Sequence, residues 1–390
     1  MKNYKAMLVG MGFVLAYCSS LAASQFNVDC NTGQTLSNAV DRAKKDDTII
    51  VTGVCDSAIT ITQNGLSIVG DNAVLSVSGN DDAISVLGAQ RVSLSNFTIR
   101  QGDRGVVLDN GASVAVDNVT VELSGSTAIE LSGGSHLALS NVWIKNSGLH
   151  GINLSMSSGI SVVSNLTIES VGAFGVNAEG LSTVLANDAM INVHGSRAMG
   201  IHMVTGSNLF INNSTLDASR NVLRGISVNS GAGFFAFSSD VIANNTLALD
   251  GMAFANAVVD VDRNASLTAN HNRRDGIVIE SSTLTSFIFP PVNGPVITAN
   301  ENGRHGIRTV LGGRLEIKAG SRLEASNNAV SGILIDDGSG ANLRNAEILD
   351  NGVADITLSF ASRLDTISGN NIGILQCDAT VVSRGQYICP

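Results

Sequence analysis

The sequence predicts an all-β chain wound as a single parallel β-helix, a solenoid of short strands. Three observations lead to this prediction. A small residue followed by an aliphatic one recurs at regular intervals through most of the chain. Between these pairs, aliphatic and polar residues alternate, as in strands with one buried face. The chain has 41 glycines and only 14% charged residues, a composition that favours strands and tight turns over helices.

The recurring pair, which we call the anchor, marks each predicted rung of the solenoid. The eleven anchors are Ala83-Ile84, Gly105-Val106, Ala128-Ile129, Gly151-Ile152, Gly175-Val176, Gly200-Ile201, Gly225-Ile226, Gly251-Met252, Gly276-Ile277, Gly306-Ile307 and Gly332-Ile333. Successive anchors are 22 to 26 residues apart, except for one interval of 30 residues after Gly276. This regular spacing predicts that the aliphatic members stack on one another along the column.

A second motif lies between the anchors and begins with asparagine. It reads NFTI at 96–99, NVTV at 118–121, NVWI at 141–144 and NLTI at 165–168. Asparagine tolerates left-handed turns, so stacked asparagines suit a repeated corner of a coil. The N-x-T triplets within these motifs also match glycosylation acceptors, but their regular spacing favours a structural role.

With these anchors and asparagine motifs, the chain resembles the right-handed parallel β-helix repeat proteins of the pectate-lyase-like superfamily. The resemblance covers residues from about 30 to 390. It implies a right-handed column with covered ends, but this fold supports many functions. The stretch RHGIR, with His305, is similar to the glycine-flanked histidine of pectin hydrolases. The neighbouring motifs of those enzymes, and those of pectate lyases and alginate epimerases, are missing.

The first 24 residues are typical of a secretory signal, with a basic start, an apolar stretch at 6–16 and small residues in SSLAAS. The mature protein, residues 25–390, is therefore expected to be exported and either secreted or periplasmic. The stretch LAYC, which ends at Cys18, resembles a lipobox and makes a lipid anchor the alternative. The bulky Tyr17 disfavours it. No later apolar run is long enough to span a bilayer, so no transmembrane segment is expected.

Four cysteines remain beyond the signal, one pair near each end: Cys30, Cys55, Cys377 and Cys389. Local pairing, Cys30 with Cys55 and Cys377 with Cys389, is the simplest of the three connectivities. A zinc site is the weaker alternative because no C-x-x-C spacing occurs.

Both ends of a β-helix expose strand edges and core, so caps are expected. Four apolar residues share one face of a helix predicted in TLSNAVDRAKK: Leu36, Ala39, Val40 and Ala43. The resemblance implies that this helix covers the first coil, within an N-terminal cap at about 30–56. A C-terminal cap pinned by a disulfide is expected at about 372–390.

The formal net charge of −10 disfavours nucleic acid as a partner. A polysaccharide or a cell-surface component is the expected partner, because local basic patches can still bind anionic sugars. The oligomeric state is left open by the sequence. No cofactor is evident.

The residues just before the anchor glycines form a candidate catalytic site. Asp250, Asp275 and His305 occupy this position on three consecutive rungs, after Arg224. Carboxylates stacked one strand spacing apart, ~5 Å, raise each other's pKa, and a nearby imidazole could carry a proton. The alternative is that these are turn residues with a structural role, since stacked charges are often structural. Calcium could bridge the two aspartates, although no calcium-loop signature occurs and no metal site is otherwise expected.

Candidate substrate-binding residues surround this site in the most basic stretch of the chain: Arg224, Arg274, Arg304 and Arg308. Arginine forks suit carboxylated or sulfated sugars. The 30-residue interval also contains FIFPPVNGP, an expected loop in which Phe289 could stack on a sugar ring.

Two classes of function are compatible with these features. The first is a non-catalytic exported protein that binds polysaccharide or a cell-surface partner, and the missing motifs favour it. The alternative is a lyase, hydrolase or epimerase acting on acidic polysaccharide. In that case Asp250 and Asp275 would be the acid/base pair, His305 would carry protons, and the arginines would bind carboxylates.

Overall fold

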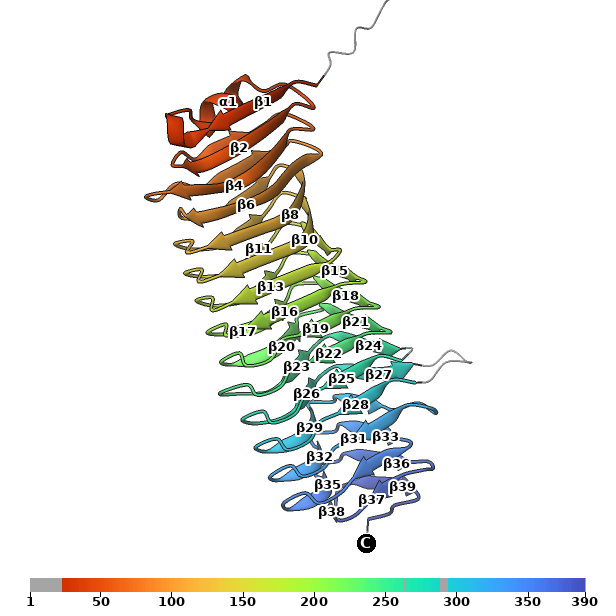
Figure 1. The fold of residues 1–390 in the computed structure, drawn as a ribbon. Coiled ribbons are helices and arrows are strands. Elements are labelled where there is room, and N and C mark those ends of the chain that lie inside the picture. The colour runs from red at the N-terminus through yellow and green to blue at the C-terminus, as the bar shows by residue number, and fades with distance from the viewer. Residues whose placement is uncertain (1–22, 263, 288–293, 390) are drawn as a thin grey trace, which may run out of the picture.

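The computed structural model describes residues 23–262, 264–287 and 294–389 and shows a right-handed column of stacked coils (Figure 1). Within these residues the strands form two sheets, a 25-stranded sheet A and a 14-stranded sheet B. Neighbouring strands of both sheets pair in parallel, so each coil bonds to the coils before and after it. Most rungs contribute two strands to sheet A and one to sheet B. The predicted all-β solenoid is therefore confirmed.

The strands of sheet B, except the first and the last two, begin at or near the anchors. They are β3 (Ile59–Ile61), β5 (Ile84–Leu87), β7 (Val106–Asp109), β9 (Ile129–Leu131), β11 (Ile152–Leu154), β14 (Val176–Ala178), β17 (Met199–Met203), β20 (Arg224–Asn229), β23 (Met252–Ala255), β26 (Ile277–Glu280), β29 (His305–Val310), β32 (Ser331–Ile335), β35 (Ala354–Leu358) and β38 (Leu375–Cys377).

Sheet A forms the remaining walls of the column. In the first half of the chain its strands are β1 (Gln25–Asp29), β2 (Thr48–Cys55), β4 (Ser67–Val77), β6 (Val92–Gln101), β8 (Ser113–Glu122), β10 (His136–Lys145), β12 (Gly159–Val162), β13 (Asn165–Glu169), β15 (Thr183–Asn187) and β16 (Met190–His194). In the second half they are β18 (Asn208–Asn212), β19 (Thr215–Asp217), β21 (Gly233–Phe237), β22 (Asp240–Ile242), β24 (Val258–Asp262), β25 (Ser266–Thr268), β27 (Thr283–Phe287), β28 (Val296–Thr298), β30 (Arg314–Glu316), β31 (Arg322–Glu324), β33 (Gly340–Leu343), β34 (Ala346–Ile348), β36 (Arg363–Thr366), β37 (Asn371–Ile372) and β39 (Val382–Gly385).

The aliphatic members of the anchors stack in register, as predicted. Ile84 pairs with Val106, and the same register continues rung by rung to the pairing of Ile307 with Ile333. The ladder also extends beyond the anchors, to Ile59 at one end and through Ile356 to Leu375 at the other. Ile356 follows an aspartate, so the small-aliphatic pattern does not reveal its rung.

The anchor glycines allow adjacent rungs to approach closely at one corner. A Cβ atom on Gly276 would lie 2.6 Å from the carbonyl oxygen of Gly306 and 2.7 Å from both the carbonyl oxygen of Ala269 and Nδ2 of Asn302. Asn302 belongs to a ladder of buried amides at this corner. Its backbone N–H and Nδ2 both donate to Oδ1 of Asn328, at 2.9 and 3.0 Å. The corner is therefore too tight for a side chain on the glycine.

The asparagine motif forms another corner, within sheet A. Asn96, Asn118 and Asn141 have φ between 52° and 62°, the left-handed conformation that asparagine tolerates. Asn118 Nδ2 donates to Asn96 Oδ1 at 3.0 Å. Asn165 has no positive φ but its Nδ2 donates to Asn141 Oδ1 at 3.2 Å. The stacked asparagines thus hold the corner, as predicted.

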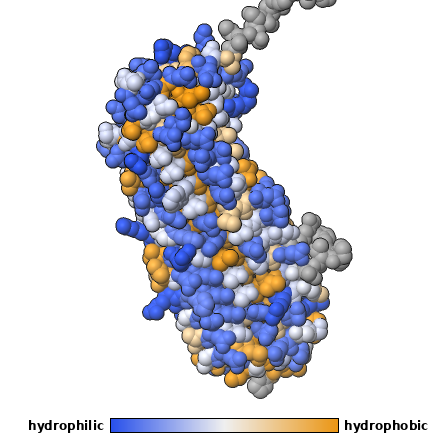
Figure 2. Space-filling view, in the orientation of Figure 1, coloured by the Kyte–Doolittle hydropathy of each residue, from blue (hydrophilic) through white to orange (hydrophobic). Residues whose placement is uncertain are grey.

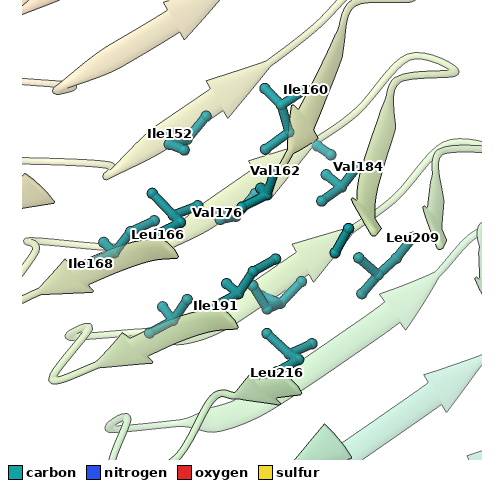
Figure 3. Close-up of a cluster of buried hydrophobic side chains, with 14 of the residues drawn as sticks. Ile152, Ile160, Val162, Leu166, Ile168, Val176, Val184, Ile191, Leu209 and Leu216 are labelled. Carbon is teal, nitrogen blue, oxygen red and sulfur yellow. The ribbon is translucent and has the colours of Figure 1, made fainter. Parts of the chain in front are cut away.

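The core is the interior of the column, where alternate residues of every strand point inward. Figure 3 shows Ile152 and Val176 of sheet B together with Ile160 and Val184 of sheet A, and all four are buried. Residues between them on the same strands point outward. In most sheet A strands alternation leaves the other side chains at least partly exposed, whereas several sheet B strands, such as β14 and β23, are buried on both faces over most of their length.

The N-terminal cap is a short helix, as predicted. Helix α1 (Leu36–Arg42) packs against β1, β2 and β3 at one end of the column, and Leu36, Ala39 and Val40 are buried (Figure 1). The 3₁₀ turn η1 (Cys30–Thr32) precedes it. No helix in the described part of the chain is long and apolar enough to cross a membrane. The predicted signal sequence, with Cys18, lies almost entirely in residues 1–22, outside the described residues.

Both predicted disulfides are present. Cys30 bonds to Cys55 and Cys377 bonds to Cys389, with Cα–Cα distances of 5.2 and 5.9 Å. Most of the C-terminal cap forms one further rung, because β38 pairs with β35 and β39 pairs with β36. Tyr387 then turns back, and its hydroxyl donates to the carbonyl oxygen of Asn370 at 3.2 Å.

Replacing an anchor glycine tests the close approach of the rungs. Gly276→Ala should lower the free energy of unfolding by about 3 kcal/mol, because its Cβ overlaps the carbonyl oxygens of Ala269, in the same rung, and of Gly306, in the next. The matched control is Gly159→Ala, whose Cβ would lie no closer than 3.6 Å to another atom. The control should change the free energy by less than about 0.5 kcal/mol in chemical denaturation. Equal effects of the two substitutions would contradict this account.

Candidate functional site

The structure brings the three predicted catalytic residues to one corner, where the chain enters sheet B. Asp250, Asp275 and His305 lie on consecutive rungs. The backbone N–H of Asp275 donates to Asp250 Oδ1 at 3.4 Å, and that of His305 donates to Asp275 Oδ1 at 3.2 Å. Each aspartate therefore accepts a hydrogen bond from the backbone of the next rung.

The Asp250 carboxylate is buried and lies between two arginines. Arg224 Nε donates to Oδ2 at 3.2 Å, and Arg274 Nε lies 3.9 Å from Oδ1. Burial of a lone carboxylate is costly, and these cations and the backbone N–H offset that cost.

Asp275 and His305 form a second buried pair of groups. Asp275 is 0% exposed, and its Oδ2 lies 3.6 Å from Arg308 Nη1, too far for a hydrogen bond. Oδ2 of Asp275 and Nδ1 of His305 are both buried without a hydrogen-bond partner in the described structure. Burial lowers the pKa of His305 to about 4; the Asp275 charge opposes this shift, whereas Arg304 and Arg308 add to it. The imidazole is therefore neutral at pH 7.

These contacts favour the structural alternative for the two carboxylates. Each is buried, accepts a backbone N–H and faces arginine, so neither carboxylate is exposed to a polymer on the surface. The catalytic role predicted for Asp250, Asp275 and His305 stays a prediction. Calcium bridging the aspartates would require the guanidinium groups to be displaced. The described residues contain no cluster of three or more His, Cys, Asp or Glu side chains placed to hold a metal ion.

Five arginines surround this corner, and we call them the arginine cluster: Arg224, Arg273, Arg274, Arg304 and Arg308. Three of them face the two aspartates, as described above. Arg273 and Arg304 form no ion pair with any described residue, and Arg273 is exposed. The nearby Glu301 lies against His271 instead, at 3.4 Å. The cluster therefore carries a surplus of positive charge on a chain whose net charge is −10.

The predicted aromatic binding residue, Phe289, lies outside the described residues. The strands that flank it, β27 and β28, both belong to sheet A, whereas Asp275 and His305 lead into sheet B. In the sequence Phe289 lies in the interval that follows Asp275, but the strands that flank it belong to the other sheet.

A stack of rings occupies the same outer face of sheet B, nearer the N-terminus. Phe174 lies between His150 and His202, with ring centroids 5.2 and 4.6 Å away. Asn177 Oδ1 accepts from His202 Nδ1 at 2.8 Å, and Asn177 Nδ2 donates to Asn153 Oδ1 at 2.8 Å. Burial lowers the pKa of both histidines, and neighbouring positive charge lowers it further. All five residues flank the anchors, so the repeat could have identified this stack.

Comparison with known proteins agrees with the geometry of the column. Residues 46–188 match a family model described as a right-handed β-helix region. This part of the chain is a right-handed β-helix. The same parallel register continues from there to β38 and β39. No curated protein matches the chain.

Several solved structures are similar to the chain at low identity. The periplasmic alginate epimerase AlgG is 12% identical, with 93% of this chain and 84% of that chain covered and a TM-score of 0.42. The alginate lyase from Paenibacillus sp. str. FPU-7 is 14% identical, with 92% and 99% covered and a TM-score of 0.33. Pectate lyase Pel9A is 11% identical, with 83% and 79% covered and a TM-score of 0.45. At these identities the likeness concerns the fold alone.

The buried imidazole of His305 predicts loss of stability in mild acid. Its pKa is about 4 in the folded chain against 6.5 for the free side chain. Between these values the unfolded chain binds a proton that the folded chain does not, so the free energy of unfolding falls as the pH drops. The loss from this residue should approach about 3 kcal/mol. Between pH 7 and 4, the free energy of unfolding of His305→Asn, measured by chemical denaturation, should depend less steeply on pH than that of the wild type.

The control for this experiment is His136→Asn, which removes an exposed histidine. It should retain the wild-type dependence on pH. A slope in His305→Asn equal to that of the wild type would contradict the buried, neutral state of His305.

Proposed function

We propose that this chain is a non-catalytic exported protein that binds an acidic polysaccharide through the arginine cluster. The observation that carries this proposal is the surplus of guanidinium groups at one corner of an otherwise acidic protein. Arginine pairs with carboxylates through two parallel hydrogen bonds, which suits a uronic acid polymer. The ring stack on the same face of sheet B extends this polar surface along the column.

The burial of the carboxylates supports binding without catalysis. A general acid or base must come within hydrogen-bond distance of the proton that it transfers. Asp250 and Asp275 are buried against arginine and backbone N–H groups. Arg273 and Arg304, by contrast, are free to contact a ligand. The cluster is therefore better suited to holding a polyanion than to breaking its bonds.

The two disulfides support export. Disulfides form and persist in oxidising compartments such as the periplasm and the extracellular space. Cys30–Cys55 and Cys377–Cys389 lie near opposite ends of the column. This agrees with the signal sequence predicted at the N-terminus.

Charge reversal in the cluster tests the proposed function. Titration calorimetry should show binding of polygalacturonate or alginate that weakens as salt is added, because salt screens exposed charges. Arg304→Glu and Arg273→Glu should each weaken binding by about 1 kcal/mol, roughly fivefold in Kd. Neither residue pairs with a buried aspartate, so both variants should fold.

The matched control is Arg42→Glu, on helix α1 at the end of the column. It should bind the polyuronates as the wild type does. Neither unsaturated ends nor new reducing ends should be released from any of them. Release of product that is lost in Asp275→Asn would overturn the non-catalytic role, and equal weakening by all three charge reversals would overturn the binding site.

A further inference from the structure

The outer face of sheet A carries a trough that no sequence motif indicates. Two lines of outward-pointing residues run along the column on the first sheet A strand of each rung, from β24 to β36. The first line contains, in register, Val258, Thr283, Arg314, Gly340 and Arg363. The second line contains Asp260, Thr285, Glu316, Asn342 and Asp365. Longer side chains thus alternate with short ones from rung to rung.

This alternation produces two hollows. The first, of about 530 Å³, lies over Thr283 and Thr285. The second, of about 320 Å³, lies over Gly340 and Asn342. Arg314 lines both hollows, so its rung forms a ridge between them. Equivalent points of the two hollows are two rungs apart, about 10 Å along the column.

The charges in the trough balance, unlike those of the arginine cluster. Three carboxylates and two cations line the hollows: Asp260, Glu316 and Asp365, with Arg314 and Arg363. Lys318, paired with Glu316, adds a third cation beside them. Lys318 Nζ lies 2.6 Å from Glu316, and Arg363 Nη2 lies 2.7 Å from Asp365. Arg314 forms no ion pair with any described residue. A polyanion would meet as many negative as positive groups here, so charge gives it no advantage.

The side chains of the trough suit the hydroxyl groups and the apolar faces of sugars. Ionised carboxylates accept hydrogen bonds from hydroxyls, and threonine and asparagine can both donate and accept. Partial burial raises the pKa of Asp260, and the charge of Asp262 raises it further. A hydroxyl donor would therefore stabilise this carboxylate. Val258 and Leu311 are exposed at the first hollow and offer apolar contact.

An aromatic pair borders the trough at its N-terminal end. Phe210 and Phe235 point outward from sheet A and stack with ring centroids 4.7 Å apart. Phe235 pairs in register with Asp260, and its ring covers the backbone of Gly233. Phe234 points inward and is fully buried. Aromatic and apolar surface beside a few polar groups is a common composition of ligand sites.

We propose that this trough is a second binding site, which takes an uncharged polysaccharide lying along the column. Alternate sugar units occupy the two hollows, and the chain crosses the Arg314 ridge between them. The spacing of the hollows is comparable with the length of a disaccharide in an extended chain. This site is on a different sheet from the arginine cluster and does not depend on the proposed function.

Filling the second hollow tests the proposal. In Gly340→Leu the new Cβ meets no atom closer than 3.7 Å, so the side chain should project into the hollow without disturbing the fold. Gly159→Leu is the matched control, because Gly159 lies on the same line of sheet A and has equal space, 3.6 Å. The probes are cellohexaose, mannohexaose and chitohexaose, with hexagalacturonate for comparison. Binding of each is measured by titration calorimetry.

The wild type and Gly159→Leu should bind at least one uncharged hexasaccharide, with little effect of salt. Gly340→Leu should lower that affinity at least tenfold, and Arg304→Glu should leave it unchanged. The corresponding disaccharide should bind more weakly, because it cannot reach both hollows. The proposal is overturned if no uncharged probe binds, or if Gly340→Leu binds the uncharged probes as tightly as the wild type does. It is also overturned if Gly340→Leu loses affinity only for hexagalacturonate.

Discussion

The parallel backbone hydrogen bonds between adjacent rungs are the constraint on which the rest of the structure depends. They hold equivalent residues of successive rungs one strand spacing apart, ~4.8 Å. Each outward side chain therefore lies next to the side chains at the equivalent position of the neighbouring rungs. Favourable stacks arise wherever amides, rings or opposite charges recur, as at Asn96 and Asn118 or at His150 and Phe174. Polar residues cover much of the face seen in Figure 2, interspersed with apolar ones.

The same constraint makes stacked carboxylates a problem for the fold. Asp250 and Asp275 occupy one position on adjacent rungs, where their charges would repel. The chain places arginine on both sides of this position, so that Arg224, Arg274 and Arg308 offset the repulsion. The positive charge left over then lies on the surface. On this account the arginine cluster is a consequence of stabilising the column and is available for binding an anionic polymer.

Periodicity in the sequence was sufficient to predict the column. The anchors identify most strands of sheet B because a strand must start at the same place in every rung. The positions of the four cysteines were sufficient for the disulfides, since each pair lies near one end. The rung of Ile356 was missed, because an aspartate stands where the anchors have a small residue.

The chemistry of the surface could not be predicted in the same way. The corner before each anchor turns, so alternation along the strand does not determine where the Asp275 side chain points. The trough depends on which residues meet across rungs: Thr283 and Arg314 are in register only because one rung is longer than the others. Register neighbours in the trough are 23 to 31 residues apart, and these intervals must be counted correctly before such neighbours can be recognised.

A double-mutant cycle between Asp275 and Arg308 tests the central claim, that Asp275 is a structural carboxylate whose buried charge is offset by Arg308. The free energy of unfolding would be measured for Asp275→Asn, Arg308→Gln and the double variant. The account predicts that Asp275→Asn costs about 3 kcal/mol and that the two substitutions are coupled by more than about 1 kcal/mol. A change below about 0.5 kcal/mol in Asp275→Asn, with no coupling to Arg308, would contradict it.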